Sequence, residues 1–379
     1  MSAETNESST AVAQTTARPL TRRAGLDSGR HRISAAGVLH RLQRAGYRVL
    51  GCEPAEVRIE RFRRSAHREL WDSFIARSAN GNLFQTRRFL EYHPAGRFED
   101  HSLLFWRGNE LLGVAAGEIA GTEWSSHRFT SHAGIAVAPD LSGDEALTLV
   151  DALLSYAARH RWKKIFMRYL PDAIAENGFA PILWALSVFG FVEDSRELTW
   201  CLIPRFGCEG DLLASYHPSA RRGIKRAQGE GLCVRASDDF GSFWKLLDGN
   251  LQQKFRVSPT HSLAEIESLQ ARCSGEVRLH AVHTAQGRMV AGTVIFDVSR
   301  TASHCFYFAQ DYAFQRARPM MLLLHAINVE YALRLRRRLN YGVITACGAR
   351  ELNLGLSRFK SRFAATPSIR RRFYWEAIN

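Results

Sequence analysis

Lysine is scarce in this sequence, and cysteine motifs are missing. Only six of its 51 basic residues are lysine, and the other 45 are arginine. The seven cysteines are scattered, and no two of them form a C-x-x-C pair, so the sequence indicates neither a zinc site nor a disulfide framework. This cysteine usage is typical of a reduced, cytoplasmic protein, and we expect no metal.

The sequence also has no long apolar run. Its most apolar stretch, residues 179–192, is short and contains Pro181 and Ser187, whereas a membrane-spanning helix needs about 20 apolar residues. The first residues include Glu4 and Glu7 and lack the basic and apolar regions of a secretory signal. We therefore expect no stable insertion into a membrane.

Positive charge is in excess. The formal net charge is +14 and the isoelectric point is about 9.8, which suits an anionic partner such as RNA, a phosphorylated cofactor or an anionic membrane surface. Coding bias also produces arginine-heavy chains with little lysine, and composition alone leaves both explanations open. The class of partner therefore has to come from the motifs.

The order of predicted elements repeats along the chain. We expect a disordered basic tail over residues 1–50, one domain over 51–205 and a second domain over 206–379. Each domain has the order strand, two helices, hairpin, strand, helix, strand, helix, strand. The hairpin turns are predicted at Gly108-Asn109 and Gln286-Gly287. This order predicts an α/β fold with a mixed sheet.

Two segments of the second copy carry a family resemblance. The segment "SARRGIKRAQGEGLCVR" is a basic helix that ends in glycine before a strand, and "LNLGLSRFKSRFAA" places Asn, Gly-Leu and Phe-Lys before a loop of small residues. Together with the element order, these segments resemble the GNAT acyltransferase fold, and the tandem copies resemble its FemAB-like branch. The resemblance implies two tandem GNAT-like domains, of which the C-terminal one is catalytic.

The resemblance also implies an activity. It implies transfer of an acyl group, acetyl or longer, from acyl-CoA to an amine or hydroxyl of a small molecule or of a precursor of the bacterial cell envelope or its polysaccharides. FemAB-like relatives differ in their donor, so an aminoacyl-tRNA-dependent transferase is a first alternative, which the net charge favours. A basic RNA-binding or scaffold protein on a degenerate GNAT fold is a second alternative.

The expected place for the donor phosphates is the helix that begins at Pro319. GNAT enzymes usually hold a pyrophosphate with a Gly-rich loop, but the matching stretch, "FQRARPMM", has no glycine. The FemAB-like branch often has a small residue and a proline there, as Ala317 and Pro319 are. Arg316, Arg318 and Met320 complete this predicted cofactor-binding segment, because a helix N-terminus offers free N–H groups to an anion. A solvated basic loop is the alternative.

The corresponding helix start in the first copy is acidic. It carries Asp140, Asp144 and Glu145, and carboxylates there satisfy the helix end internally and repel pyrophosphate. We therefore place the donor in the second domain.

The helix predicted at 219–229 is strongly basic. Arg221 and Lys225, like Arg222 and Arg226, are four residues apart and lie on neighbouring faces. Clustered cations repel one another unless an anion is near. We expect Arg222 and Lys225 to contact cofactor phosphate and Arg221 to contact the substrate. A solvated basic face is the alternative.

The predicted strand "HCFYFAQ" and the residues after it supply further candidates. Alternation places Tyr307 and Asp311 on the same face as Cys305, and aromatic residues in a strand are usually core. GNAT cofactors lie along this strand, so the resemblance makes Tyr307 and Tyr312 candidate substrate-binding residues. Asp311 is the candidate that takes a proton from the acceptor. Three histidines are its rivals, each with a structural alternative: His261, His304 and His325.

The segment "ELNLGLSRFKSRF" (351–363) is predicted as a helix with Lys360 and Asn353 on one flank. Its apolar stripe consists of Leu352, Leu356, Phe359 and Phe363. In one interpretation, the aliphatic part of the Lys360 side chain lies on the apolar face and its ammonium group reaches the solvent. The resemblance to the Phe-Lys motif implies instead a catalytic lysine that stabilises the oxyanion of acyl transfer, with Asn353 orienting the lysine or the acceptor.

Overall fold

The computed structural model describes residues 31–33, 40–43, 47, 56–94, 96–128, 130–175, 180–346 and 350–377. The chain divides into two compact units. Of the described residues, the C-terminal unit contains Arg196–Arg370 with Pro171–Ile174, and the N-terminal unit contains those from His31 to Leu170, those within Ala175–Ser195 and those from Arg371 onward. Each unit is described by itself below.

One sheet forms the centre of the C-terminal unit. Its strand order is β11-β12-β13-β14-β15-β10, and all neighbours are antiparallel except β14 and β15, which are parallel. The strands are β10 (Val192–Leu202), β11 (Cys233–Ser237), β12 (Val277–His283), β13 (Met289–Asp297), β14 (Ala302–Gln310) and β15 (Arg338–Val343). Two short strands, β16 (Thr345–Ala346) and β17 (Glu351–Leu352), pair with each other.

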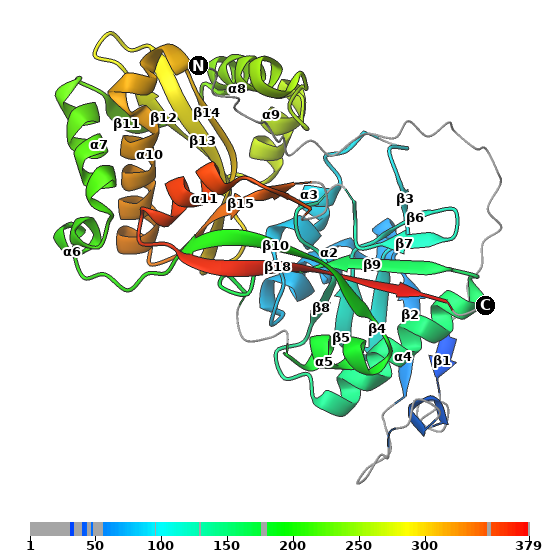
Figure 1. The fold of residues 1–379 in the computed structure, drawn as a ribbon. Coiled ribbons are helices and arrows are strands. Elements are labelled where there is room, and N and C mark those ends of the chain that lie inside the picture. Colours follow the sequence, from blue (N-terminus) through cyan, green and yellow to red (C-terminus); the bar gives the residue numbers. More distant parts are fainter. Residues whose placement is uncertain are drawn as a thin grey trace. The chain divides into compact units, whose positions relative to one another are not determined.

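Helices cover both faces of this sheet. Figure 1 shows α7 and α10 on one face and α8 and α9 on the other. The helical segments are α6 (Glu209–Ala214), α7 (Pro218–Gly229), α8 (Phe240–Phe255), α9 (Leu263–Arg272), η2 (Tyr312–Ala317), α10 (Pro319–Asn328), η3 (Val329–Arg334) and α11 (Leu354–Ser361). The core between the sheet and α7 and α10 is built from side chains such as Ile224, Leu323, Ile327 and Ile295. This burial is the main favourable contribution to the stability of the unit.

The N-terminal unit has two groups of strands. One sheet has the order β1-β2-β4-β5-β8, and the other group has the order β18-β9-β7-β6-β3. The first consists of β1 (His31–Ile33), β2 (Val57–Arg61), β4 (Leu103–Arg107), β5 (Glu110–Ala115) and β8 (Ile135–Val137). The second consists of β3 (Glu99–Asp100), β6 (Glu118–Ala120), β7 (Glu123–Ser125), β9 (Lys164–Arg168) and the end of β18 (Thr366–Glu376).

The helical segments of this unit are α2 (Arg64–Arg77), η1 (Leu83–Gln85), α3 (Arg87–Leu90), α4 (Gly143–Arg159) and α5 (Ala180–Val188). The helix predicted to begin at the acidic residues 140–145 is confirmed as α4. Ser142 and Glu145 form a reciprocal capping box at its start. Both predicted hairpin turns are confirmed: Gly108 and Gly287 have positive φ angles, which glycine adopts without strain. No helix in the described parts of the chain is long and apolar enough to cross a membrane.

Two features of the N-terminal unit differ from the sequence prediction. Residues 31–33 were expected in a disordered tail, but they form β1 and pair with β2. Leu42, in the same predicted tail, is buried, and Arg41 forms an ion pair with Asp151 of α4. In addition, the second strand of the hairpin, predicted over 111–119, is divided into β5 and β6, and β7 follows where no strand was predicted. The rest of residues 1–50, apart from His40, Gln43 and Tyr47, lies outside the described residues.

Candidate active site

The parallel strands β14 and β15 separate in the middle of the C-terminal sheet. Their register covers three pairs and ends at His304 and Asn340, whereas the strands continue to Gln310 and Val343. Backbone groups beyond the last pair are therefore not used in this ladder. A split between adjacent strands is a place where another group can approach the sheet backbone.

Helix α11 places a lysine at this split. Lys360 is only 4% exposed, and its Nζ donates to the carbonyl oxygens of Gly342 at 2.9 Å and Val343 at 3.0 Å. The interpretation of an ammonium in water is therefore wrong. An ammonium can donate three hydrogen bonds, and the third has no partner among the residues that the structure describes.

The environment of Lys360 disfavours its charge. Burial lowers the pKa of Lys360 from 10.5 to about 7, while the nearby Cys305 and Cys201 partly oppose this shift. No carboxylate forms an ion pair with it among the described residues. Lys360 therefore loses its proton at lower pH than an ordinary surface lysine.

Asn353 has a local role that the sequence prediction missed. Helix α11 begins at Leu354, and the Asn353 side chain accepts a hydrogen bond from the Leu356 N–H at 2.8 Å. Residues 351–352 form β17 instead of a first helical turn, and Leu352 is 61% exposed, so it does not belong to the apolar stripe. An asparagine at this position caps the helix that carries Lys360. The predicted contribution of Asn353 to catalysis stays a prediction.

The backbone that holds Lys360 contains a bulge. The register between β10 and β15 shifts between Thr199 and Cys201, and Gly342 has a φ of 78°. Consecutive carbonyls point in opposite directions in a regular strand, but here those of Gly342 and Val343 both accept from one ammonium. A side chain at Gly342 would strain this conformation.

Polar side chains surround the bulge. His304 Nδ1 lies 2.8 Å from Asn340 Oδ1, which also accepts the Gly342 N–H at 2.8 Å. Asn340 Nδ2 donates to Thr199 Oγ1, and Thr199 Oγ1 donates to the Gly342 carbonyl. His304 was a candidate site residue from the sequence, whereas Asn340 and Thr199 were not. A signal existed in "RLNYGV", because an asparagine in a central strand needs buried partners.

The predicted proton acceptor, Asp311, has two partners. Its Oδ1 accepts the Ala313 N–H at the start of η2, and its Oδ2 pairs with Arg288 at 2.6 Å. Its side chain is 21% exposed. Tyr312 is the first residue of η2 and is partly buried. Their catalytic and substrate-binding roles stay predictions.

Tyr307 points to the face of the sheet that α8 covers. Its hydroxyl lies 2.7 Å from His261 Nδ1, and its ring contacts Trp244 edge to face. The strand prediction placed Cys305 on the same face, which is wrong: a register shift between β13 and β14 puts Cys305 into the core under α10. This bulge breaks the two-residue period. A bulge leaves no pattern in a single sequence that distinguishes it from a regular strand.

The predicted phosphate-binding segment begins α10. Pro319 is the first helical residue, as predicted, and Arg318 caps the helix with a φ of 62°. Arg316 and Arg318 are exposed, and Met320 packs partly against the core. The helix N-terminus therefore has two flanking cations and no acidic residue in its first turn.

Helix α7 lies against the first turn of α10. A Cβ on Gly223 would approach Met321 Cγ to 2.9 Å, so only glycine permits this distance. Arg222 and Lys225 are exposed on α7. Arg221 has local partners: its Nη1 donates to the carbonyls of Ala214 and Tyr216 and closes the turn between α6 and α7, and its contact with the substrate stays a prediction.

In the N-terminal unit, the side chain of Tyr169 lies at the place that corresponds to the split between β14 and β15. Strand β8 belongs to one sheet and β9 to the other group, and Tyr169 fills the space near Gly134, where a Cβ would lie 2.5 Å from its ring. The Tyr169 hydroxyl also accepts from the Ile135 N–H at 3.3 Å. Glu145 caps the start of α4, as the sequence predicted, and pairs with Arg107.

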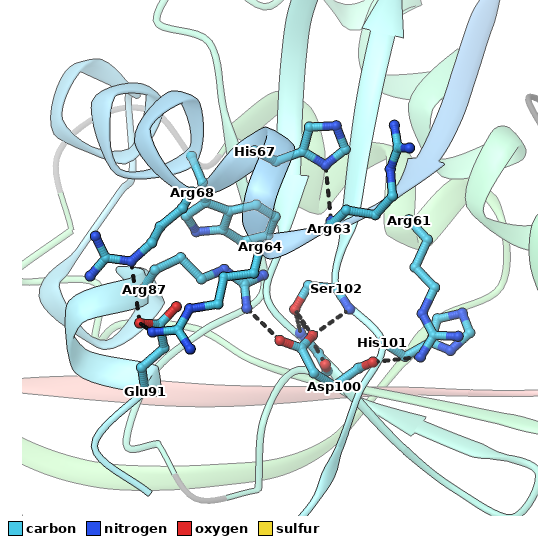
Figure 2. Close-up of polar contacts among 12 residues, drawn as sticks. Arg61, Arg63, Arg64, His67, Arg68, Arg87, Glu91, Asp100, His101 and Ser102 are labelled. Atoms are coloured by element: carbon cyan, nitrogen blue, oxygen red, sulfur yellow. Dashed lines mark hydrogen bonds and ion pairs between the residues drawn. The ribbon is translucent and has the colours of Figure 1, made fainter. Parts of the chain in front are cut away.

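The N-terminal unit buries a cation of its own, Arg87, which is 1% exposed (Figure 2). Its Nη1 pairs with Asp100 at 2.5 Å, and its guanidinium lies 3.4 Å from the ring centre of Phe62 and 4.1 Å from that of Trp71. Asp100 also accepts from the Ser102 N–H and hydroxyl. This is a paired and stacked charge, typical of a structural role.

Residues 214–361 match the family model described as an acetyltransferase (GNAT) domain. This stretch of the chain therefore carries the sequence pattern of a GNAT domain. It contains the split of β14 and β15, the basic start of α10 and Lys360. A search of curated proteins found no match to this sequence.

Solved structures show the fold of the chain beyond this domain. FemX has a TM-score of 0.62 at 14% identity, over 84% of this chain and 97% of its own. L-PGS from Bacillus licheniformis has a TM-score of 0.52 at 10% identity, over 82% and 92%. The predicted α/β fold of the FemAB-like tandem GNAT type is confirmed.

Proposed function

We propose that this protein is an acyltransferase that moves an acyl group from acyl-CoA to the amine or hydroxyl of an acceptor, with Lys360 as a catalytic residue. The observation that carries this proposal is the buried Lys360 ammonium at the point where β14 and β15 separate. A buried charge without a carboxylate is costly, and a use in the transition state explains why the GNAT domain keeps it.

The chemistry needs one developing negative charge to be stabilised. The acceptor nitrogen or oxygen attacks the carbonyl carbon of the thioester, and the carbonyl electron pair moves to the oxygen. The third N–H of Lys360 donates to this oxyanion, and its charge strengthens the interaction in a site with little water. The C–S bond then breaks, the thiolate leaves, and the proton lost by the acceptor passes to the thiolate, with Asp311 as the proposed carrier.

The phosphates of the donor are assigned to the start of α10. Free N–H groups at the helix N-terminus, Arg316 and Arg318, and the exposed Arg222 and Lys225 on the adjacent α7 form a basic surface. The acceptor class follows the resemblance to FemAB-like proteins: a small molecule or a cell-envelope or polysaccharide precursor. Tyr307, Tyr312 and Arg221 have partners within the fold, and we keep them as second-choice acceptor residues.

An aminoacyl-tRNA donor is the second candidate. The same oxyanion chemistry serves an aminoacyl ester, and the net charge of +14 suits a polyanion. A basic RNA-binding scaffold without catalysis is the third candidate, but it gives no reason for a buried lysine at the strand split.

A thermal-shift experiment separates these candidates. Acetyl-CoA, longer acyl-CoAs and bulk tRNA are added separately to the full chain, because a ligand that binds only the native state raises its melting temperature. We expect a shift with CoA esters that CoA-free thioesters do not give. A shift with tRNA alone favours the second or third candidate, and transfer of radiolabelled amino acid then decides between them. No shift with any CoA ester contradicts the proposed donor.

A further inference from the structure

The two carbonyls that hold Lys360 have an arrangement that the sheet does not supply by itself. Gly342 adopts a left-handed conformation inside β15, and the peptide after it turns so that the Gly342 and Val343 oxygens lie 2.9 and 3.0 Å from the same Nζ. The ladder between β14 and β15 has already ended at Asn340. On the other side, β10 pairs with Asn340 and Val343 but the register skips the residues between them, so side chains have to hold Gly342.

Asn340 fixes it through its amide oxygen. The oxygen accepts the Gly342 N–H at 2.8 Å, two residues along the same strand. The contact of 2.8 Å with His304 Nδ1 requires the imidazole to donate as well. The bond to His304 is buried and the bond to Gly342 is partly buried, and a hydrogen bond away from water is stronger than at the surface.

Thr199 completes the connection from the neighbouring strand. Its hydroxyl accepts from Asn340 Nδ2 at 2.8 Å and donates to the Gly342 carbonyl at 2.9 Å, so each partner uses a different part of the hydroxyl. Cys201 Sγ takes the second hydrogen of the Asn340 amide at 2.9 Å. The Gly342 carbonyl is thus held between Thr199 and Lys360.

We infer that Asn340 and Thr199 are positioning residues for Lys360, which act by holding the Gly342 carbonyl toward its ammonium. The catalytic meaning of this inference rests on the proposed function, but the positioning itself is a property of the free protein. Two hydrogen bonds to the ammonium favour its charged form. Loosening the Gly342 carbonyl therefore lowers the fraction of charged Lys360 at neutral pH.

The other titratable groups around Lys360 do not change charge near neutral pH. Cys201 comes from β10, and Cys305 and His304 come from β14. Burial raises the pKa of the Cys201 thiol to about 12, raises that of Cys305 further, and lowers the pKa of His304 to about 3. Arg370 of β18, near His304, pairs with Glu197. A transition near pH 7 in this cluster therefore belongs to Lys360.

The test is an NMR titration of the full chain without substrate. Lysine labelled with ¹³C at Cε gives six signals, one for each lysine, and the Lys360 signal is the one missing from Lys360→Arg. Thr199→Val is nearly isosteric and removes the hydroxyl. We expect it to lower the Lys360 titration midpoint by about 0.5–1 pH unit, the size of a weakened hydrogen bond to a charge.

Two variants serve as controls. Thr199→Ser keeps the hydroxyl and should keep the midpoint of the wild-type protein. Ser303→Ala removes another buried hydroxyl of the same unit, one that donates to Asp297, and it should lower stability without moving the midpoint. An unchanged midpoint in folded Thr199→Val, or an equal shift in Ser303→Ala, overturns the inference.

The titration also separates this inference from the proposed function. A lowered midpoint in Thr199→Val, in a protein whose wild type transfers no acyl group, leaves the positioning intact and contradicts the function. Active wild-type enzyme with an unmoved midpoint contradicts the positioning alone. Where the enzyme is active, we expect Thr199→Val to lower kcat about 10-fold with little change in KM, and Thr199→Ser to restore it.

Discussion

The two units bury a cation in opposite ways. Arg87 of the N-terminal unit is paired with Asp100 and stacked on two aromatic rings. Among the described residues, Lys360 of the C-terminal unit has two backbone carbonyls as hydrogen-bond acceptors, and burial lowers its pKa to about 7. The charge of Arg87 is paired with a carboxylate inside the fold, whereas the charge of Lys360 has no carboxylate partner among the described residues.

The two units also differ at the place where β14 and β15 separate in the C-terminal unit. In the C-terminal unit, β14 and β15 separate beside Lys360. In the N-terminal unit, Tyr169 fills the comparable place, and Glu145 caps the helix that corresponds to α10. A duplicated order of elements therefore does not duplicate a site: a lysine lies where the strands separate in one copy, and a tyrosine lies at the corresponding place in the other.

The largest expected effect is the loss of turnover in Lys360→Met. This variant keeps the length of the stem and removes the charge, and we expect kcat to fall on the order of 10²–10³ with little change in KM, as for the loss of one oxyanion donor. Steady-state kinetics with the donor found by thermal shift measures it. Lys245→Met, at an exposed position of α8, is the matched control and should retain full activity; equal losses in both variants contradict the assignment.

Arg87→Met should show the reverse pattern. Removing Arg87 leaves the Asp100 carboxylate without its partner. We expect a loss of about 2–3 kcal/mol in the free energy of unfolding, below the range for a fully buried pair because the Asp100 side chain is 37% exposed. The kcat of the folded fraction should not change. Urea unfolding measures the stability, and Arg68→Met, at the exposed pair with Glu91, should stay within about 0.5 kcal/mol.

The stability of the protein should also depend on pH through Lys360. Its pKa is about 7 in the folded state and 10.5 as the ordinary value, so between these values the unfolded chain binds more protons than the folded one. Stability due to this group therefore rises with pH above 7, by at most about 1.4 kcal/mol per pH unit. Urea unfolding from pH 7 to 9 should show this rise in the wild type. The same rise in Lys360→Met would assign it to other groups.

The smallest expected effect concerns the basic surface on α7. Replacing both Arg222 and Lys225 with glutamine should weaken donor binding about 3–10-fold at low salt, and less at high salt, because ions screen the exposed charges. Isothermal calorimetry at two ionic strengths measures it. The matched control is the double change of Lys245 and Arg272 to glutamine, at exposed positions of α8 and α9. Unchanged donor affinity at low salt would contradict a role of Arg222 and Lys225 in donor binding.

The sequence predicted the parts of the fold that depend on local patterns. Helix α4 with its cap, the two glycine hairpin turns, Pro319 at the start of α10 and the repeated order of elements were all visible in it. It also identified Lys360, through the rarity of lysine and the Phe-Lys resemblance. The sequence placed the start of α11 too early, at residue 351 instead of 354. Leu352 keeps the helical spacing to Leu356, so the apolar pattern did not show that Asn353 caps the helix.

The remaining features depend on contacts between distant residues. The burial of Lys360 requires β10, β14 and β15 to meet around it, and the bulges at Phe306 and Gly342 leave no periodic signal. Asn340 and Thr199 are 141 residues apart in the sequence. Arg221 resembled its neighbours in the sequence, and only the fold turns it toward the carbonyls of Ala214 and Tyr216.

The pH dependence of kcat/KM, compared between the wild type and Lys360→Arg, tests the central claim most directly. A charged Lys360 is required in the transition state, so activity in the wild type should fall as the pH rises through about 7, the pKa of Lys360. Lys360→Arg should be slower at every pH, because the guanidinium places its donors differently, but it should lack this fall up to pH 9. The same descending limb in both proteins would show that another group titrates and would contradict the role of Lys360.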